Sequence, residues 1–289
     1  MSPTSLADQL RAATARLTVA GVPSARHDAE VLAGHVLGLS RADVAVAALR
    51  GDDVRLDERF DDLVDERARR VPLQHLTGTA PFRDLELAVG PGVFVPRPET
   101  ESVAQPAIDE ARALVGAGRR PVVVDLCTGS GAIALAVATE VPGAQVHAVE
   151  LSEQAVAWAA VNVARLAPAV DLRTGDASSA FDDLDGAVDV VVSNPPYIPP
   201  DQVPVDPEVR DHDPEVALYG LGADGLQVPR AVVVAAARLL RPGGLLVVEH
   251  ADVQQVALLR TLTSSGLWRE AAGHPDLTGT PRLVSARRA

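Results

Sequence analysis

The residues best suited to chemistry are Asn194, Pro195, Pro196 and Tyr197, which stand side by side in the sequence. They follow the apolar run at 188–192, which predicts a buried strand of a parallel sheet. Because a proline lacks the amide donor that a central strand needs, the chain must leave the sheet at Pro195. We therefore expect Asn194 and Tyr197 at the carboxyl end of a strand, where open α/β sheets bind their ligands.

This arrangement suits the recognition of a flat group that carries an NH2. Asn194 Oδ1 and the carbonyl of Pro195 can accept both hydrogens of the NH2, while the ring of Tyr197 stacks on the flat group. The substrate would then be an amide or an exocyclic amine. A strand that simply ends in a Pro-Pro turn beside a half-buried tyrosine has the same residues. The motif alone is consistent with both interpretations.

Length, composition and charge restrict the possible classes. The chain has 289 residues, of which 47% are hydrophobic, and suits two domains. Its formal net charge of −13 argues against a duplex-DNA binder, which needs a cationic surface. The single cysteine, Cys127, excludes an internal disulfide and a cysteine-rich zinc site, and we expect no metal. We expect a cytoplasmic protein, because no long uncharged apolar run occurs and Asp8 and Arg11 interrupt any signal-peptide core.

The periodicity divides the chain into three parts. Residues 1–75 are predicted to be all helical, with apolar residues such as Leu6 and Leu10 at helical spacing. Residues 76–98 alternate and predict a β-hairpin that turns at 90–92. Residues 99–289 alternate between strands and helices, which predicts an α/β domain with a mainly parallel sheet. Seven strands are expected, at 122–124, 145–150, 170–174, 188–192, 245–249, 268–274 and 282–287.

Carboxylates stand at the ends of three successive predicted strands. Residues 129–134 read Gly-x-Gly-x-x-Ala and begin a helix, so their backbone can approach a ligand closely. A dinucleotide such as NAD would also fit, with Glu150 binding the ribose hydroxyls. Asp125 would repel a pyrophosphate but suits an ammonium group such as that of S-adenosyl-L-methionine. Asp176 can meet an adenine amino group. Taken singly, a helix-capping role for Asp125 and a turn role for Asp176 explain these residues equally well.

Together these motifs resemble class I S-adenosylmethionine-dependent methyltransferases that act on nitrogen. More narrowly, the chain resembles the HemK/PrmC family, which methylates glutamine in peptide chain release factors. The resemblance rests on DLCTGSGAIAL at 125–135 and VSNPPYI at 192–198, and on blocks at 71–78, 94–101, 223–226, 240–244 and 276–282. Two positions depart from the family pattern. Cys127 stands where many relatives have glycine, and Ala177 stands where some have an aromatic residue.

The resemblance implies a class I, Rossmann-like methyltransferase domain at 99–289, a helical substrate-recognition domain at 1–75 and a hairpin linker at 76–98. The expected cofactor contacts are Asp125, Cys127, Thr128, Gly129, Ser130, Gly131, Glu150, Asp176, Ala177 and Asn194. The expected catalytic and substrate contacts are Asn194, Pro195, Pro196 and Tyr197, with Arg97 and Glu99 in the substrate cleft. His250, which follows Glu249, receives no role.

The implied reaction transfers a methyl group from S-adenosyl-L-methionine to the glutamine side chain of the Gly-Gly-Gln motif in class 1 release factors, leaving S-adenosyl-L-homocysteine. We expect a monomer that binds no nucleic acid directly. Positioning of the amide nitrogen, rather than a strong base, would carry the catalysis. Three alternatives stay open: a ribosomal-protein glutamine methyltransferase, an adenine-specific DNA methyltransferase that flips out its base, and a non-catalytic partner of translation proteins.

Overall fold

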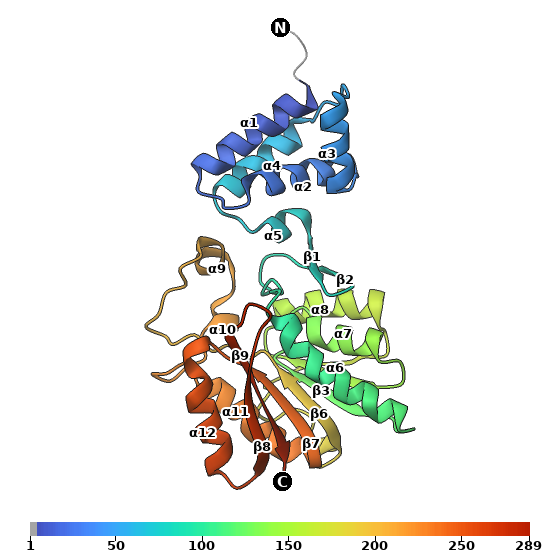
Figure 1. Ribbon diagram of the computed structural model, residues 1–289, viewed down its shortest axis with the longest axis vertical. Helices are drawn as coiled ribbons and strands as arrows, with labels where there is room; N and C mark the ends of the chain where they lie inside the picture. Colours follow the sequence, from blue (N-terminus) through green and yellow to red (C-terminus); the bar gives the residue numbers. More distant parts are fainter. Residues whose placement is uncertain (1–4) are drawn as a thin grey trace. The chain divides into compact units, whose positions relative to one another are not determined.

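The computed structural model describes residues 5–289, and the chain divides into two compact units (Figure 1). Unit 1 is formed by Met1–Thr79 together with Pro204–His212, and unit 2 by Ala80–Val203 together with Asp213–Ala289. The loop that follows the Asn-Pro-Pro-Tyr motif therefore supplies a short insertion to unit 1. Sequence periodicity did not predict that insertion, because nine residues show too little pattern to assign them to a core.

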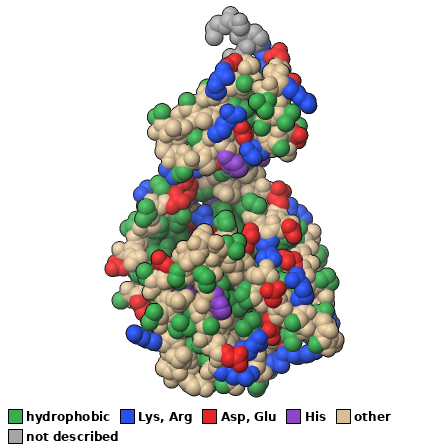
Figure 2. Space-filling view, in the orientation of Figure 1, with side chains coloured by type: hydrophobic (Ala, Val, Ile, Leu, Met, Phe, Trp, Pro, Cys, Tyr) green, Lys and Arg blue, Asp and Glu red, His purple; other side chains and the backbone are tan. Residues whose placement is uncertain are grey.

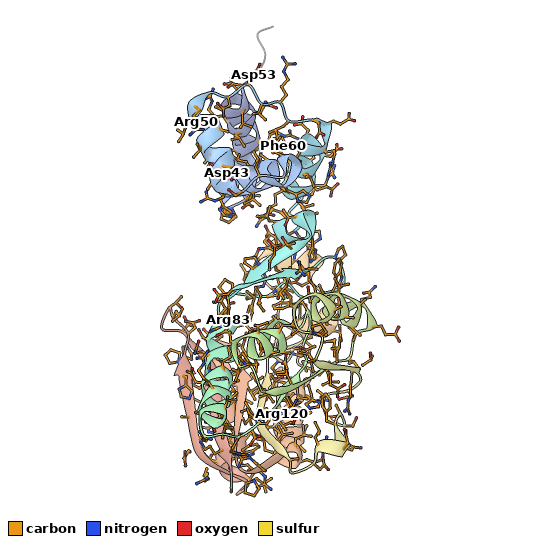
Figure 3. The ribbon with its side chains drawn as sticks, turned by 90° about the vertical axis from the view of Figure 1, so that its right-hand side faces the viewer. Asp43, Arg50, Asp53, Phe60, Arg83 and Arg120 are labelled. Carbon is orange, nitrogen blue, oxygen red and sulfur yellow. The ribbon has the colours of Figure 1, made fainter. Side chains whose placement is uncertain are left out.

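Unit 1 is helical. Its helices are α1 (Leu6–Val19), α2 (Ala25–Leu37), α3 (Arg41–Arg50), α4 (Glu58–Ala68), α5 (Leu73–Thr77) and α9 (Pro207–His212). Helix α1 begins at a capping box, in which the Ser5 side chain accepts from the Asp8 amide. Leu6 and Leu10 are fully buried, as their spacing predicts. Phe60, labelled in Figure 3, is also buried in this core, which explains why the highly charged α4 packs as a helix.

Unit 1 also contains a buried ionic network. Arg67 donates through Nε to Asp28 Oδ2 at 2.8 Å and pairs through Nη1 with Glu208 Oε1 at 2.7 Å. Arg70 Nε donates to the same Glu208 oxygen at 2.8 Å. Although burial would raise it, the hydrogen bonds from Arg70 and Arg67 hold the pKa of Glu208 well below its usual value. Glu208 thus anchors the 204–212 insertion in its unit.

The hairpin lies earlier in the chain than predicted. Strands β1 (Thr79–Phe82) and β2 (Leu85–Ala88) form a two-stranded sheet, and Arg83 occupies the left-handed region between them with φ +51°. The predicted turn at 90–92 is present, and the Val93 amide donates to the Gly90 carbonyl at 3.4 Å, but it is not the turn of the hairpin because residues 93–95 form no strand. Val93 and Val95 alternate because both are buried in the core of unit 2, not because they pair with a strand. Alternation of apolar and polar residues indicates that one side of a segment is buried. It does not show whether the backbone pairs with a neighbouring strand, which is what distinguishes a strand from a packed extended segment.

Unit 2 is built on a seven-stranded sheet, which confirms the predicted fold class. Its strands are β3 (Val122–Leu126), β4 (Gln145–Glu150), β5 (Asp171–Thr174), β6 (Val188–Ser193), β7 (Leu240–Glu249), β8 (Trp268–Pro275) and β9 (Pro281–Arg288). Their order is β5-β4-β3-β6-β7-β9-β8. The first five strands run parallel, and β9 runs antiparallel to both of its neighbours.

Helices cover both faces of this sheet (Figure 1). On one face lie α6 (Thr100–Gly116), α7 (Ala132–Glu140) and α8 (Glu153–Leu166). On the other lie α11 (Gln227–Leu239) and α12 (Gln255–Ser264), and the short α10 (Glu215–Leu218) precedes them in the chain. Successive strand residues belong to opposite cores: Val123 packs with the first set of helices and Val124 with the second. This double burial explains the continuous apolar runs of the central strands.

The register aligns the carboxyl ends of the central strands. Strand β3 lies between β4 and β6, which is the point where the strand order reverses. Leu126 is opposite Val149 on one side and Ser193 on the other, and Ser193 is in turn opposite Val248. The residues that follow these positions therefore meet at one edge of the sheet.

No single helix within residues 5–289 is both long and apolar enough to cross a membrane. Only the bent pair formed by Ala25–Leu37 and Arg41–Arg50 meets the requirement, and it does so by combined length and composition alone.

Candidate active site

Asp125 carries an unpartnered buried oxygen at the end of β3. Its Oδ2 accepts from Thr128 Oγ1 at 2.5 Å and from the Ala134 amide at 3.1 Å. No donor within residues 5–289 reaches its Oδ1, although only 1% of the residue is exposed. Burial raises the pKa of Asp125 to about 7, and the two hydrogen bonds oppose this rise. A cationic donor beside Oδ1 would satisfy the carboxylate and lower its pKa.

The glycine loop that follows has the backbone shape of a ligand cradle. Gly129 and Gly131 lie in the left-handed region, with φ of +59° and +88°, and Gly131 caps the start of α7. Cys127 also has a positive φ, +63°, which is why glycine suits this position better. Burial raises the pKa of the Cys127 thiol, which disfavours the reactive thiolate form.

Glu150 ties this loop to the end of β4. Its Oε2 accepts from the Gly129 amide at 2.8 Å and its Oε1 from the Ser152 amide at 2.9 Å. Each oxygen of the carboxylate has two lone pairs but accepts one hydrogen bond here. Glu150 can therefore accept two further hydrogen bonds, one from each of two hydroxyl groups.

Asp176 and Ala177 form the corner after β5, next to the backbone of Glu150, whose carbonyl accepts from the Gly175 amide at 2.9 Å. Asp176 is exposed, and the Ser178 amide that donates to its Oδ1 at 2.8 Å holds the pKa of Asp176 below its usual value. Ala177 is half-buried against the second core. The three carboxylates thus end three neighbouring strands, as the sequence predicts.

Asn194 directly follows β6, and the nitrogen of its side-chain amide is hydrogen bonded. Its Nδ2 donates to Thr100 Oγ1 at 3.1 Å, from the first residue of α6. The preceding residue, Ser193, donates through Oγ to the Leu126 carbonyl at 2.6 Å, which ties the end of β6 to that of β3. Pro195 is buried. The Asn-Pro-Pro-Tyr segment therefore leaves the sheet next to the glycine loop.

The backbone of Tyr197 is fixed from outside the motif. The amides of Tyr197 and Ile198 both donate to the Leu218 carbonyl, at 3.1 and 2.8 Å. Gln254 Nε2 donates to the Tyr197 carbonyl at 2.8 Å. A Cβ on Gly220 would lie 2.7 Å from the Pro196 carbonyl oxygen, so the 218–226 loop can pack here only with glycine. Sequence reasoning missed Gln254 and Gly220, and the only signal was the family block at 223–226.

Glu249 lies at the end of β7, beside the motif. It is 1% exposed, and its Oε1 accepts from the Tyr197 hydroxyl at 3.2 Å. No hydrogen-bond partner within residues 5–289 reaches its other oxygen, Oε2. Burial raises the pKa of Glu249 to about 7, whereas Thr100 and the nearby Arg282 act to lower it. Sequence reasoning assigned Glu249 no role, because a strand-ending glutamate has no motif of its own.

The two residues expected in the substrate cleft differ in their surroundings. Arg97 Nη2 pairs with Asp213 Oδ2 at 2.7 Å, and its guanidinium lies 5.0 Å from the centre of the Phe94 ring. Arg97 is therefore held by its own unit. Glu99 immediately precedes α6, and its charge acts to raise the pKa of Glu249.

The sequence of this chain is similar to those of known proteins. Residues 8–78 match the model of the PrmC N-terminal domain, and residues 111–206 match the methyltransferase small domain. A release factor glutamine methyltransferase of Streptomyces coelicolor is 55% identical over 278 residues, covering 96% of both chains. One from Mycolicibacterium smegmatis is 47% identical over 285 residues, covering 99% of this chain and 98% of that one. A solved structure of a ribosomal protein L11 methylase from Lactobacillus delbrueckii subsp. bulgaricus has a TM-score of 0.48 at 18% identity, covering 69% of this chain and 83% of that chain.

Similarity of this degree over nearly the full length, together with the strand order and the motif at the end of β6, shows that the chain belongs to the family of release factor glutamine methyltransferases.

Proposed function

We propose that this protein transfers a methyl group from S-adenosyl-L-methionine to the glutamine side-chain nitrogen of the Gly-Gly-Gln motif in class 1 peptide chain release factors. The observation that carries the proposal is the Asn194 amide. Its Nδ2 is engaged by Thr100, at the sheet edge shared with the glycine loop. Its Oδ1 is thereby the atom available to accept from a substrate amide.

The residues around the glycine loop fit the proposed cofactor. The orphaned Asp125 oxygen suits the ammonium of its methionyl part, and Glu150 suits the ribose hydroxyls. The corner at Asp176 and Ala177 suits the adenine. When bound, S-adenosyl-L-methionine supplies an electrophilic methyl group on a positively charged sulfur.

The chain's own task is to hold a poor nucleophile in place. A glutamine nitrogen is weakly nucleophilic because its lone pair is delocalised into the carbonyl. Asn194 Oδ1 and the Pro195 carbonyl accept its two hydrogens, which directs the nitrogen and favours the positive charge that develops on it. Tyr197, held through its hydroxyl by Glu249, presents its ring to the flat amide. The methylated nitrogen then loses one proton to water.

The other parts of the chain have supporting roles in this proposal. We assign recognition of the release factor to residues 1–75, the linker to 76–98 and catalysis to 99–289. Arg97 and Glu99 border the substrate cleft. The protein acts as a monomer in the cytoplasm and binds no nucleic acid directly. On the face of unit 2 that Figure 2 shows, acidic and basic side chains are interspersed, and the net charge is −13, which disfavours DNA as the substrate.

Labelled S-adenosyl-L-methionine tests the proposal when it is incubated with the protein and, separately, a release factor, ribosomal proteins and DNA. We expect label on the Gly-Gly-Gln glutamine, located by mass spectrometry, and none on a release factor whose glutamine is replaced by alanine. Asn194→Ala should lower kcat by about 100-fold or more while leaving the Kd of the cofactor within about twofold. Label confined to ribosomal protein or DNA, or full activity of Asn194→Ala, would overturn the proposal.

A further inference from the structure

Asn162, on helix α8, forms three hydrogen bonds that join the glycine loop to strand β2. Its Oδ1 accepts from the Ala88 amide at 2.7 Å, and its Nδ2 donates to the Ala88 carbonyl at 2.9 Å. The same Nδ2 donates to the Ser130 carbonyl at 3.0 Å. Asn162 is 0% exposed, so bulk water does not compete for these partners. One buried amide therefore holds the backbone of two segments that are distant in the sequence.

The chemical types of these partners fix the orientation of the Asn162 amide. The oxygen and nitrogen of an asparagine are nearly equal in size, so shape alone does not distinguish the two orientations. Here the Ala88 amide can only donate and must face Oδ1, whereas the carbonyls of Ala88 and Ser130 can only accept and must face Nδ2. Both hydrogens of Nδ2 are used. The three backbone groups thus require one acceptor and two donors in a plane, which is what asparagine provides.

The bond to Ser130 fixes the centre of the glycine loop. The peptide group between Ser130 and Gly131 is held at both ends, because its carbonyl accepts from Asn162 and its N–H donates to the Thr128 carbonyl at 2.9 Å. A Cβ on Gly131 would lie 3.9 Å from the Cβ of Ala159, which precedes Asn162 by one turn of α8. The glycine loop therefore packs directly against the helix that carries Asn162.

Helix α8 also holds β2 and the residues that follow it (Figure 1). Trp158, Asn162 and Arg165 lie on one face of α8, at spacings of four and three residues. Trp158 Nε1 donates to the Pro91 carbonyl at 3.2 Å, and Arg165 donates to the Glu86 carbonyl. Among these three side chains of the described chain, only Asn162 is also hydrogen bonded to the glycine loop.

We propose that Asn162 is a positioning residue, which sets the shape of the glycine loop for the cofactor and makes that shape depend on the packing of β2 against α8. It acts through the Ser130 carbonyl. Without the Asn162 amide this carbonyl would be buried with no donor, and rotation of the Ser130–Gly131 peptide would turn the Gly131 amide away from Thr128. This inference rests on the proposed function, because it takes the glycine loop as the binding site of S-adenosyl-L-methionine.

A binding measurement tests the positioning role. Asn162→Asp keeps the size of the side chain and the acceptor for the Ala88 amide, but its carboxylate has no donor for the two carbonyls. We expect the Kd of S-adenosyl-L-methionine, measured by calorimetry, to rise by about 10-fold or more. Asn162→Ala should raise it similarly and replaces the first variant if circular dichroism shows that Asn162→Asp is unfolded.

The matched control is Arg165→Ala, which removes a hydrogen bond from the same face of α8 to the same strand but leaves the Ser130 carbonyl bonded. Its Kd for the cofactor should stay within about twofold of the wild-type value. A folded Asn162 variant with the wild-type Kd would overturn the inference, since a residue that serves stability alone gives this result. An equal rise of the Kd in Arg165→Ala would overturn it too.

Hydrogen exchange in the protein without cofactor provides a second readout. The rate of the Gly131 amide is measured by NMR relative to that of the Val124 amide in β3, which reports global unfolding. The ratio should rise by about 10-fold in Asn162→Asp and stay unchanged in Arg165→Ala. An equal ratio in the wild type and Asn162→Asp would refute the role of Asn162. A wild-type protein that binds no S-adenosyl-L-methionine would instead refute the proposed function, and the exchange ratio would still decide the inference.

Discussion

Asp125→Asn should stabilise the free protein at alkaline pH while weakening its cofactor binding. The reason is the buried oxygen Oδ1, which no donor within residues 5–289 reaches. Burial raises the pKa of Asp125 from 3.8 to about 7. Between these two pH values the folded protein binds a proton that the unfolded chain has lost, so the free energy of unfolding falls as the pH rises.

The magnitude follows from the pKa difference. A difference of about three pH units corresponds to about 4 kcal/mol, lost progressively between about pH 4 and pH 7. Asparagine carries no such penalty, but its NH2 would replace Oδ1 and lack a partner, at a cost of about 1–3 kcal/mol. At pH 8.5 the variant should therefore be about 1–3 kcal/mol more stable than the wild type. At pH 5.5 the advantage should shrink by about 2 kcal/mol.

Urea unfolding followed by tryptophan fluorescence provides the assay. The two tryptophans, Trp158 and Trp268, both lie in unit 2, so the signal reports the unit that contains Asp125. Asp176→Asn is the matched control. Asp176 is exposed and the pKa of its carboxyl is lowered, so this variant should show no change between pH 5.5 and 8.5. If Asp125→Asn changed stability equally at both pH values, the buried-carboxylate argument would be wrong.

Three further predictions concern the supports of the site. Gly220→Ala should lower kcat by about 100-fold, because its Cβ would lie 2.7 Å from the Tyr197 Cα. The control is Gly116→Ala, whose Cβ would meet nothing within 4 Å and which should not change kcat. Equal values of kcat for the two variants would contradict the steric argument. Glu208→Gln should destabilise unit 1 by about 3 kcal/mol in a far-ultraviolet circular dichroism melt, and hydrogen exchange of residues 204–212 should accelerate with it. An unchanged exchange rate would show that the ionic network does not anchor the insertion. Glu150→Gln should weaken S-adenosyl-L-methionine binding by about 10-fold or more by calorimetry, and an unaltered Kd would remove Glu150 from the cofactor site.

Much of the fold was predictable because it depends on local patterns. The apolar run before Asn194 predicted a doubly buried strand, and the two prolines predicted its end. The strand–helix alternation predicted a parallel sheet, whose topology requires that the carboxyl ends meet at one edge. Where the same kind of pattern failed, at 93–95, burial without strand pairing produced the alternation.

The sequence by itself therefore determined which residues end the strands and that Asp125, Glu150 and Asn194 share an edge. Only the tertiary structure decided which side chains from distant parts of the sequence contact the site residues. Asn194 and Thr100 are 94 positions apart, and Tyr197 and Glu249 are 52 apart. Such contacts have no local period, because they form only when a helix and two strands pack together. The unpartnered oxygens have the same origin, since whether a carboxylate is satisfied depends on every neighbour that packing brings to it.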